Sequence, residues 1–174
     1  MAQEPIIMPI IGYDGKYEIH LTGTPDGQPG IWRCDKGRYK TQSINTSTGR
    51  KFIWLSKNNI GNCITVHQLL AEHFIIPPDD KYRTVDHING DYKDNRIQNL
   101  RWLTPAEQEI NKPGNLGYSW SSDHNKYRAR IKVNGKEIHL GYFDHPYKAH
   151  LAYKAACELY YPGIRTCLRE EIDG

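Results

Sequence analysis

Hydrophobic residues recur at helical spacing between Val66 and Phe74, with Leu69 and Leu70 on the same stripe. A stripe of this kind is typical of an amphipathic helix with one buried face. The Pro77-Pro78 pair that follows cannot continue a helix. The pattern therefore predicts a helix over residues 66–74, which we expect to pack against the segment after it.

Apolar and polar residues alternate over residues 127–133, so that the apolar positions from Ala129 to Val133 share one face. Residues 136–141 alternate again. The Asn134-Gly135 pair between them is the strongest short signal for a type I′ hairpin turn. The pattern predicts two antiparallel strands with one apolar and one polar face.

A further strand is expected at residues 117–120, and a helix from about residue 145 to residue 160. Asp144 is placed to cap this helix, and its alanines and Tyr153 form one stripe at helical spacing. Small residues allow a helix to lie close to a sheet. Residues 118–165 are therefore predicted to form a three-stranded sheet packed on one helix.

Short strands separated by glycine-rich turns are predicted for residues 1–65, at residues 17–21, 31–34 and 52–55. Five basic residues lie in or beside the loops of this region: Lys36, Arg38, Lys40, Arg50 and Lys51. The region is either a solvated small sheet or a surface that binds an anionic partner.

The middle of the chain combines both kinds of element. Residues 85–88 and 99–103 are predicted strands, separated by turn-forming Asn, Gly and Asp residues. Thr104 is placed to be the N-cap of a short helix, with Pro105 at its first position and Glu107 completing a capping box. The order is therefore strand, loop, strand, short helix.

The predicted fold class is α+β, with a ββα unit between a small N-terminal β region and a C-terminal three-stranded sheet packed on one helix. The expected divisions are residues 1–65, 66–112, a linker at 113–117, 118–165 and a tail at 166–174.

The 174 residues allow one or two domains, and the formal net charge of +3 hides an uneven distribution. Residues 1–65 carry eight Lys/Arg and five Asp/Glu, residues 66–112 carry six and eight, and residues 117–165 carry eight and four. Basic outer regions around an acidic middle are expected if the outer regions hold a phosphate backbone and the middle holds a cation.

The four cysteines have no CxxC spacing, which argues against a zinc ribbon, and free buried thiols are expected. No stretch is apolar enough to span a bilayer, and the N-terminus lacks a basic segment followed by an apolar run. We expect a soluble, cytoplasmic protein that does not bind a membrane.

Oxygen donors and an imidazole gather in the ββα region. Asp86 offers a carboxylate oxygen, and Gln108 and Asn111 lie three residues apart on one face of the predicted helix. This set of donors suits Mg²⁺, Mn²⁺ or Ca²⁺ better than zinc. The imidazole of His87 can take a proton from water near neutral pH. A cation and a general base together can attack a phosphodiester.

Residues 86–111 resemble the HNH nuclease motif through DHxNG, DN, NLRW and TPxE. The resemblance implies a ββα-metal fold that uses Mg²⁺ or Mn²⁺, with His87 as general base, Asp86 as metal ligand and Asn99 as a brace for the loop. The chain departs from the family at the helix ligand, which is commonly an asparagine. Gln108 stands at that position, Asn111 lies one turn later, and both remain candidates.

Three further residues lie near the motif, and their roles are less direct. Arg101 either contacts phosphate or lies on the strand surface. His73 lies within the apolar stripe of its helix and is expected to be a core histidine. His67 lies off the stripe and is expected to face the candidate site or the DNA.

Residues 118–165 resemble the plant ethylene-response-factor (APETALA-type) DNA-binding domain through GYSW, YRARI, LGYF and the alanine-rich helix. The resemblance implies that the open face of the sheet contacts DNA. By position, the residues facing DNA would be Ser119, Arg128, Arg130, Lys132 and His139. Serine and histidine stand where plant members commonly have arginine and tryptophan, so base preference does not transfer.

Together these features predict a phage- or intron-type HNH homing endonuclease that cuts duplex DNA as a monomer. Activity is expected to fall below about pH 6.5, where an unperturbed histidine becomes protonated. The competing hypothesis is a non-catalytic DNA-binding regulator derived from such a nuclease, because Gln108 replaces the usual asparagine.

Overall fold

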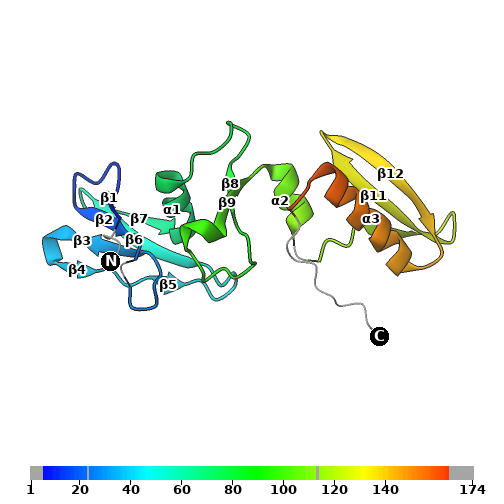
Figure 1. Cartoon of the computed structure of the whole chain (residues 1–174). Helices are drawn as coiled ribbons and strands as arrows, with labels where there is room; N and C mark the ends of the chain where they lie inside the picture. Colours follow the sequence, from blue (N-terminus) through cyan, green and yellow to red (C-terminus); the bar gives the residue numbers. More distant parts are fainter. Residues whose placement is uncertain (1–5, 23, 113, 165–174) are drawn as a thin grey trace, which may run out of the picture. The chain divides into compact units, whose positions relative to one another are not determined.

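The computed structural model describes residues 6–22, 24–112 and 114–164. Its contacts divide the chain into two compact units, residues 1–102 and 103–174. Helices and several small antiparallel sheets alternate along the chain, which confirms the expected α+β class (Figure 1). None of the helices in the described part of the chain has the length and apolar character that crossing a bilayer requires.

Two antiparallel sheets begin the first unit. The first has the strand order β1 (Ile7–Pro9), β2 (Tyr17–His20), β3 (Gly30–Arg33) and β4 (Arg38–Tyr39), with a 3-10 turn at Cys34–Lys36. The second has the order β5 (Ser43–Ile44), β6 (Lys51–Lys57) and β7 (Ile60–Thr65). The strands expected near residues 17, 31 and 52 are therefore present, and β7 was not anticipated.

The expected helix is confirmed as α1 (Val66–Phe74). It precedes a two-stranded sheet of β8 (Thr84–His87) and β9 (Leu100–Leu103), with a 3-10 turn at Ile97–Asn99 directly before β9. Asn99 therefore ends this turn instead of beginning the strand.

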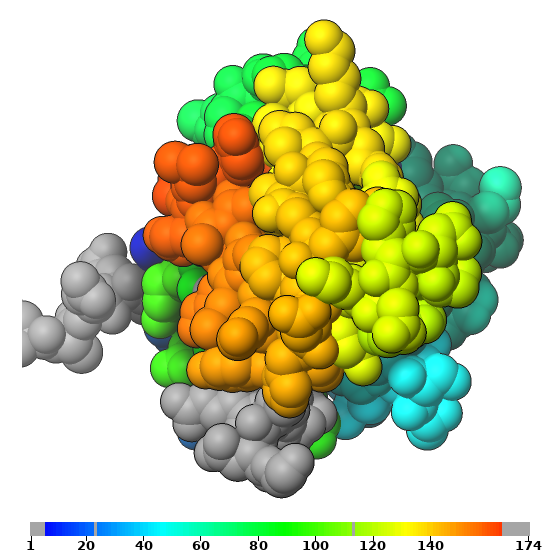
Figure 2. Space-filling view, turned by 90° about the vertical axis from the view of Figure 1, so that its right-hand side faces the viewer, coloured from blue at the N-terminus to red at the C-terminus, as the bar shows by residue number. Residues whose placement is uncertain are grey.

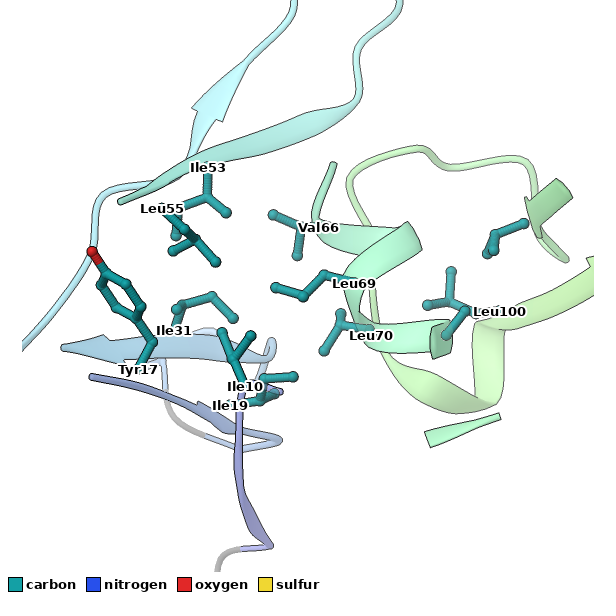
Figure 3. Packing of buried hydrophobic residues seen from close by; sticks show 12 residues of the cluster. Ile10, Tyr17, Ile19, Ile31, Ile53, Leu55, Val66, Leu69, Leu70 and Leu100 are labelled. Atoms are coloured by element: carbon teal, nitrogen blue, oxygen red, sulfur yellow. The ribbon is translucent and has the colours of Figure 1, made fainter. Parts of the chain in front are cut away.

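One hydrophobic core joins these elements (Figure 3). Ile53 and Leu55 point inward from β6, whereas Trp54 between them is 57% exposed, as the two-residue period of a strand requires. Leu70 of α1 and Leu100 of β9 belong to the same core. The helix thus packs against the segment that follows it, as expected, and also against both sheets.

The second unit contains α2 (Pro105–Asn111), a sheet in the order β10 (Tyr118–Ser121), β11 (Lys126–Val133) and β12 (Lys136–Phe143), and α3 (Pro146–Tyr160). Ile110 of α2 packs with Ile131 of β11 and Tyr153 of α3 in a second core. The capping box is confirmed, because the Thr104 hydroxyl accepts from the Glu107 amide and the Glu107 carboxylate accepts from the Thr104 amide.

The predicted hairpin turn is also confirmed, since Asn134 and Gly135 both have positive φ, at 49° and 79°. One feature of the hairpin was missed. Arg130 pairs with His139 but Ala129 pairs with Gly141, so Leu140 is an extra residue in β12. This irregularity shifts the register while keeping Arg130 opposite His139.

Two expectations were wrong. Asp144 does not cap α3, because the cap is His145, whose Nδ1 accepts from the Tyr147 amide at 3.2 Å. Pro146 fixes the first helical position one residue later than expected, and Asp144 instead pairs with Lys126 at 3.3 Å.

The buried thiols were the second wrong expectation. Cys157 is buried, but Cys34 and Cys63 are exposed. Cys34 follows the end of β3, and Cys63 lies opposite the exposed Trp54 on the outer face of its sheet. Cys167 lies outside the described residues.

Gly117 permits the closest approach between the linker and α3. Its φ is +73°, and a Cβ atom there would lie 1.9 Å from Cγ of Tyr153. We expect Gly117→Ala to destabilise the second unit by roughly 2–5 kcal/mol, through overlap and backbone strain together. Urea unfolding measures this loss of stability, and hydrogen exchange of the amides in β11 and α3 shows whether it falls on the second unit.

Gly114→Ala is the matched control, because Gly114 has a φ of +82° but open space at the Cβ position. An equal loss of stability in both variants would mean that φ alone, and not the contact with Tyr153, requires glycine at residue 117.

Candidate functional site

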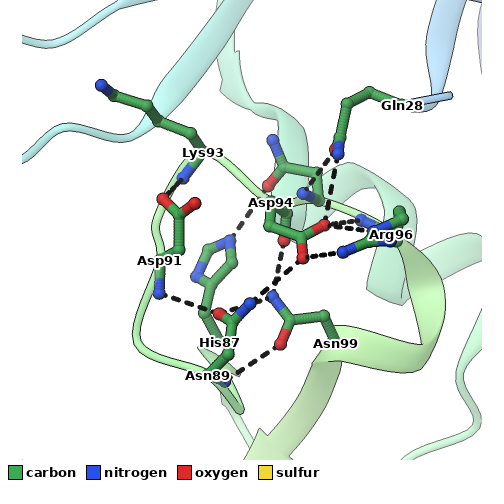
Figure 4. A network of polar contacts seen from close by, with 9 residues as sticks. Gln28, His87, Asn89, Asp91, Lys93, Asp94, Arg96 and Asn99 are labelled. Carbon is green, nitrogen blue, oxygen red and sulfur yellow. Dashed lines mark hydrogen bonds and ion pairs between the residues drawn. The ribbon is translucent and has the colours of Figure 1, made fainter. Parts of the chain in front are cut away.

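His87 ends β8 and is only 1% exposed (Figure 4). Its Nε2 lies 3.0 Å from Oδ1 of Asn95. With Oδ1 of Asn95 as the acceptor, Nε2 carries the proton and donates it, while Nδ2 of Asn95 is buried without a hydrogen-bond partner among the described residues. The other ring nitrogen, Nδ1, is buried and has no hydrogen-bond partner in the described part of the chain. The imidazole is therefore held in the tautomer that leaves the lone pair of Nδ1 available.

Asn99 ties together the loop that carries Asn95. Its Oδ1 accepts from the Asn89 amide at 3.0 Å, and its Nδ2 donates to Oδ1 of Asn89 at 2.9 Å and to the Asp94 carbonyl at 2.8 Å. Asn99 makes no direct hydrogen bond to His87 among these contacts. Its position suits a brace, whereas Asn95 is the residue that contacts the imidazole.

Charge and a distant strand fix the same loop. Arg96 lies 2.6 Å from Asp94 and holds the pKa of that carboxyl well below its usual range, mainly through this hydrogen bond. Gln28, which precedes β3, donates to Asp94 at 3.3 Å and accepts from the Asn95 amide at 2.9 Å (Figure 4). The N-terminal sheets therefore help to place the residue that orients His87.

Asp86 is 5% exposed and is ion-paired with Arg101, whose Nε and Nη2 both lie 2.9 Å from its Oδ2. Arg101 is thus a partner of the expected metal ligand, and whether it contacts phosphate stays a prediction. A cation at Asp86 would have to share this carboxylate with the guanidinium or displace it.

Two aromatic rings cover His87. The ring of His67 lies 5.2 Å from it and that of Tyr92 lies 5.7 Å from it, centroid to centroid. His67 faces the candidate site, which is one of the two orientations expected for it. It is only 4% exposed, so its side chain is not available at the surface. His73 is hydrogen-bonded to the Leu69 carbonyl and the Ile11 amide, as a structural histidine would be.

Burial lowers the pKa of both imidazoles that face each other here, because the charged form is poorly solvated. For His67 the pKa falls to about 3, and Arg50 adds to the effect. His87 therefore stays unprotonated at lower pH than a free histidine, and the fall in activity expected near pH 6.5 moves to lower pH.

Gln108 and Asn111 lie on α2 in the second unit, whereas Asp86 and His87 belong to the first. Oε1 of Gln108 and Oδ1 of Asn111 are buried and accept no hydrogen bond from the described residues. Among the residues that the structure describes, no group of three or more His, Cys, Asp or Glu side chains is placed to hold a metal ion. The amide oxygens of Gln108 and Asn111 are thus each of the kind that a hard cation accepts as a ligand.

The expected DNA-facing residues share the open face of the second unit's sheet. Ser119 lies opposite Arg128, His139 opposite Arg130, and Lys132 opposite Glu137. Arg128 and Arg130 are not free cations, because Glu137 binds both, at 2.8 and 2.9 Å. A groove of about 720 Å³ borders this face and is lined in part by Arg130, Lys132 and Glu137.

Sequence reasoning missed three residues of these sites. Asn95 had been assigned only to a turn, Gln28 is 67 residues away from the amide that it accepts from, and Glu137 was counted only as part of a polar face. The one available signal was the Asp94-Asn95 pair, since two polar residues within a metal-binding motif can be buried and hydrogen-bonded.

Residues 65–110 match the model of the HNH endonuclease family. Two relatives are HNH endonuclease L245 of Acanthamoeba polyphaga mimivirus, 35% identical over 87 residues, and DNA endonuclease I-HmuI of Bacillus phage SP01, 32% identical over 102 residues. The matches cover 50% and 59% of this chain but only 25% and 52% of the relatives, so the chain spans about half of their length or less.

The structural comparison agrees with these relatives. A solved structure of the HNH homing endonuclease I-HmuI, which describes DNA binding and cleavage, matches with a TM-score of 0.55 at 25% identity. The match covers 88% of this chain and 82% of that one. The likeness thus extends well beyond the HNH segment.

The buried His67 predicts a pH dependence of stability. Its folded pKa of about 3 lies below the unfolded value near 6.5, so the unfolded chain alone takes up a proton between these values. The contribution of His67 to the free energy of unfolding is fully present above pH 6.5. Below pH 6.5 it should decrease, by at most about 1.4 kcal/mol per pH unit. We expect His67→Phe to lose less stability than the wild type between pH 7 and pH 5.

Urea unfolding at pH 7, 6 and 5, monitored by tryptophan fluorescence, measures this difference, and Trp102 of the first unit contributes to the signal because its indole donates to the Ile75 carbonyl in the folded protein. Asp94 does not interfere, since its contribution is lost only below the unfolded carboxyl pKa of about 4. The same pH dependence in both proteins would show that His67 is not the group responsible.

Proposed function

We propose that this chain is a site-specific DNA endonuclease of the homing type, which hydrolyses phosphodiester bonds of duplex DNA with His87 as general base. The observation that carries the proposal is the buried imidazole of His87, held at Nε2 by Asn95 with Nδ1 free, inside a segment that matches the HNH endonuclease family. The likeness to a homing endonuclease that binds and cleaves DNA supports the same activity.

In the proposed reaction, Nδ1 of His87 takes a proton from the attacking water. The hydrogen bond from Nε2 to Asn95 keeps the ring in the required tautomer and aims it. Asn99 holds the loop of Asn95 in place through Asn89 and the Asp94 carbonyl. Because His87 is buried, water has to reach Nδ1 through a local opening beside the rings that cover it, which include Tyr92.

Asp86 and the amide oxygens of Gln108 or Asn111 are the residues that would hold a divalent ion, for which we propose Mg²⁺ or Mn²⁺. Such an ion, when bound, stabilises negative charge on the scissile phosphate and the leaving oxygen. Arg101 is paired with Asp86 and partly neutralises the carboxylate, which an ion held there would share with the guanidinium or take from it.

The remaining parts of the chain are proposed to hold the DNA. Residues 1–65 and 118–165 are the two basic regions, and residues 66–112 between them carry the candidate catalytic residues, with a linker at 113–117 and a tail at 166–174. We propose that residues 118–165 act as an ethylene-response-factor-like DNA-binding module, and the three-stranded sheet packed on α3 supports this. We propose that one copy of the chain acts on each DNA site.

The role of Asn95 can be separated from that of His87. We expect His87→Ala to lower the single-turnover cleavage rate by about 10²- to 10⁴-fold, since it removes the general base. Asn95→Leu, which removes the acceptor, should lower it by roughly 10- to 100-fold. Asn95→Asp keeps an acceptor and should retain most of the rate. Each rate is measured on a plasmid that carries a cut site.

DNA binding should be unchanged in all three variants, because none of the substituted residues is a proposed DNA contact. Normal cleavage by His87→Ala would reject the base assignment. Binding with no cleavage by the wild type at any Mg²⁺ or Mn²⁺ concentration would instead indicate the non-catalytic regulator.

The helix ligand can be identified by its effect on metal dependence. The variant that removes the true ligand, Gln108→Ala or Asn111→Ala, should raise the Mg²⁺ concentration for half-maximal cleavage by roughly tenfold or more, as expected for the loss of one contact to a charged group. Titration calorimetry with Mn²⁺ gives the same comparison without catalysis. If both variants bind metal like the wild type, α2 supplies no ligand.

A further inference from the structure

Glu137 lies on the open face of the second unit's sheet and makes two ion pairs. Its Oε1 is 2.8 Å from Nη2 of Arg128, and its Oε2 is 2.9 Å from Nη1 of Arg130. Both carboxylate oxygens are thereby used. Figure 2 shows the yellow atoms of the hairpin exposed beside the orange atoms of α3, and Arg130, Lys132 and Glu137 of the hairpin are exposed.

The positions in the sheet show which residue sets this arrangement. Glu137 stands directly opposite Lys132, whereas Arg128 lies four residues from Lys132 along β11. Four residues of a strand span roughly 13 Å. The side chain of Arg128 therefore has to extend along the strand to reach Glu137, instead of standing away from the sheet. The Nε of Arg128 makes no hydrogen bond to the described residues, so Glu137 is what holds its guanidinium.

We propose that Glu137 is a specificity-determining residue, which keeps Arg128 and Arg130 from binding DNA phosphates indiscriminately. This inference rests on the proposed function, because it requires that the sheet face contacts duplex DNA. Non-specific binding is carried mainly by contacts to phosphates, and the carboxylate of Glu137 repels phosphates while it competes for both guanidinium groups. Non-specific binding is therefore weakened at its strongest contacts.

A specific site can replace what Glu137 supplies. Guanine presents two acceptors, O6 and N7, to an arginine in the major groove, and the N4 amino group of cytosine can donate to a carboxylate. Base edges can thus satisfy both partners of the ion pair at once, whereas the phosphate backbone satisfies only the arginines. A carboxylate between two arginines therefore favours sequence discrimination at the expense of affinity.

The test compares full-length wild type with Glu137→Gln, which keeps the shape of the side chain and removes its charge. Binding to a random-sequence duplex is measured by fluorescence anisotropy from 50 to 300 mM salt without divalent metal. Two released arginines add about 1.8 to the slope of log affinity against log salt, which is about a sevenfold change in affinity for each threefold change in salt. Glu137→Gln should bind this duplex more tightly and with the steeper slope.

Cleavage of a random duplex library with Mg²⁺, followed by sequencing of the ends, gives the second readout. Glu137→Gln should cut a broader set of sites than the wild type. Glu158→Gln is the matched control, because it removes one exposed carboxylate from α3, on the other side of the same module, and should leave both readouts unchanged. In an Arg130→Ala background, the gain from Glu137→Gln should shrink.

An unchanged salt slope and an unchanged set of cut sites in Glu137→Gln would overturn the inference, as would an equal gain in Glu158→Gln. Loss of cleavage without a gain in random-duplex affinity would also overturn it, because Glu137 would then not compete with phosphates for the arginines. A wild type that neither binds nor cuts duplex DNA would refute the proposed function itself, which is a separate outcome.

Discussion

The hydrogen bond between Nε2 of His87 and Oδ1 of Asn95 is the contact on which the candidate active site depends. It is made between two residues that are almost completely buried, and it determines which ring nitrogen keeps a lone pair. Burial then lowers the pKa of His87, so the imidazole stays neutral and able to accept a proton. The contact with Asn95 thus sets the orientation of the ring, whereas burial lowers its pKa against the opposing effect of that same hydrogen bond.

The rest of the first unit supports this contact. The core around α1 fixes β8, which ends at His87, and β9, which begins directly after Asn99. Gln28 then connects the N-terminal sheets to the loop, through Asp94 and the Asn95 amide. A polar loop that is buried must satisfy nearly all its donors and acceptors, and here distant parts of the chain supply several of them. The β region is therefore part of the support for the candidate catalytic residues.

Charge is arranged by partners in both units. Asp86 is paired with Arg101, and Arg128 and Arg130 are paired with Glu137, so residues that look like free ligands or free cations in the sequence are already bound. Pairs of this kind set the direction of long side chains and lower the gain from any ligand that must replace one partner. If the sheet face contacts DNA as proposed, such competition would limit non-specific binding.

The sequence alone determined the features that depend on neighbouring residues. Periodicity gave α1, the capping box gave the start of α2, and Asn134-Gly135 gave the hairpin turn, because each rests on local backbone preferences. The motif also placed Asp86 next to His87. Only the tertiary structure decided that Asn95 orients His87, that Gln28 holds Asn95, and that Glu137 binds two arginines. These contacts depend on loop closure, core packing and strand register. None of the three can be read from the spacing of the residues along the chain.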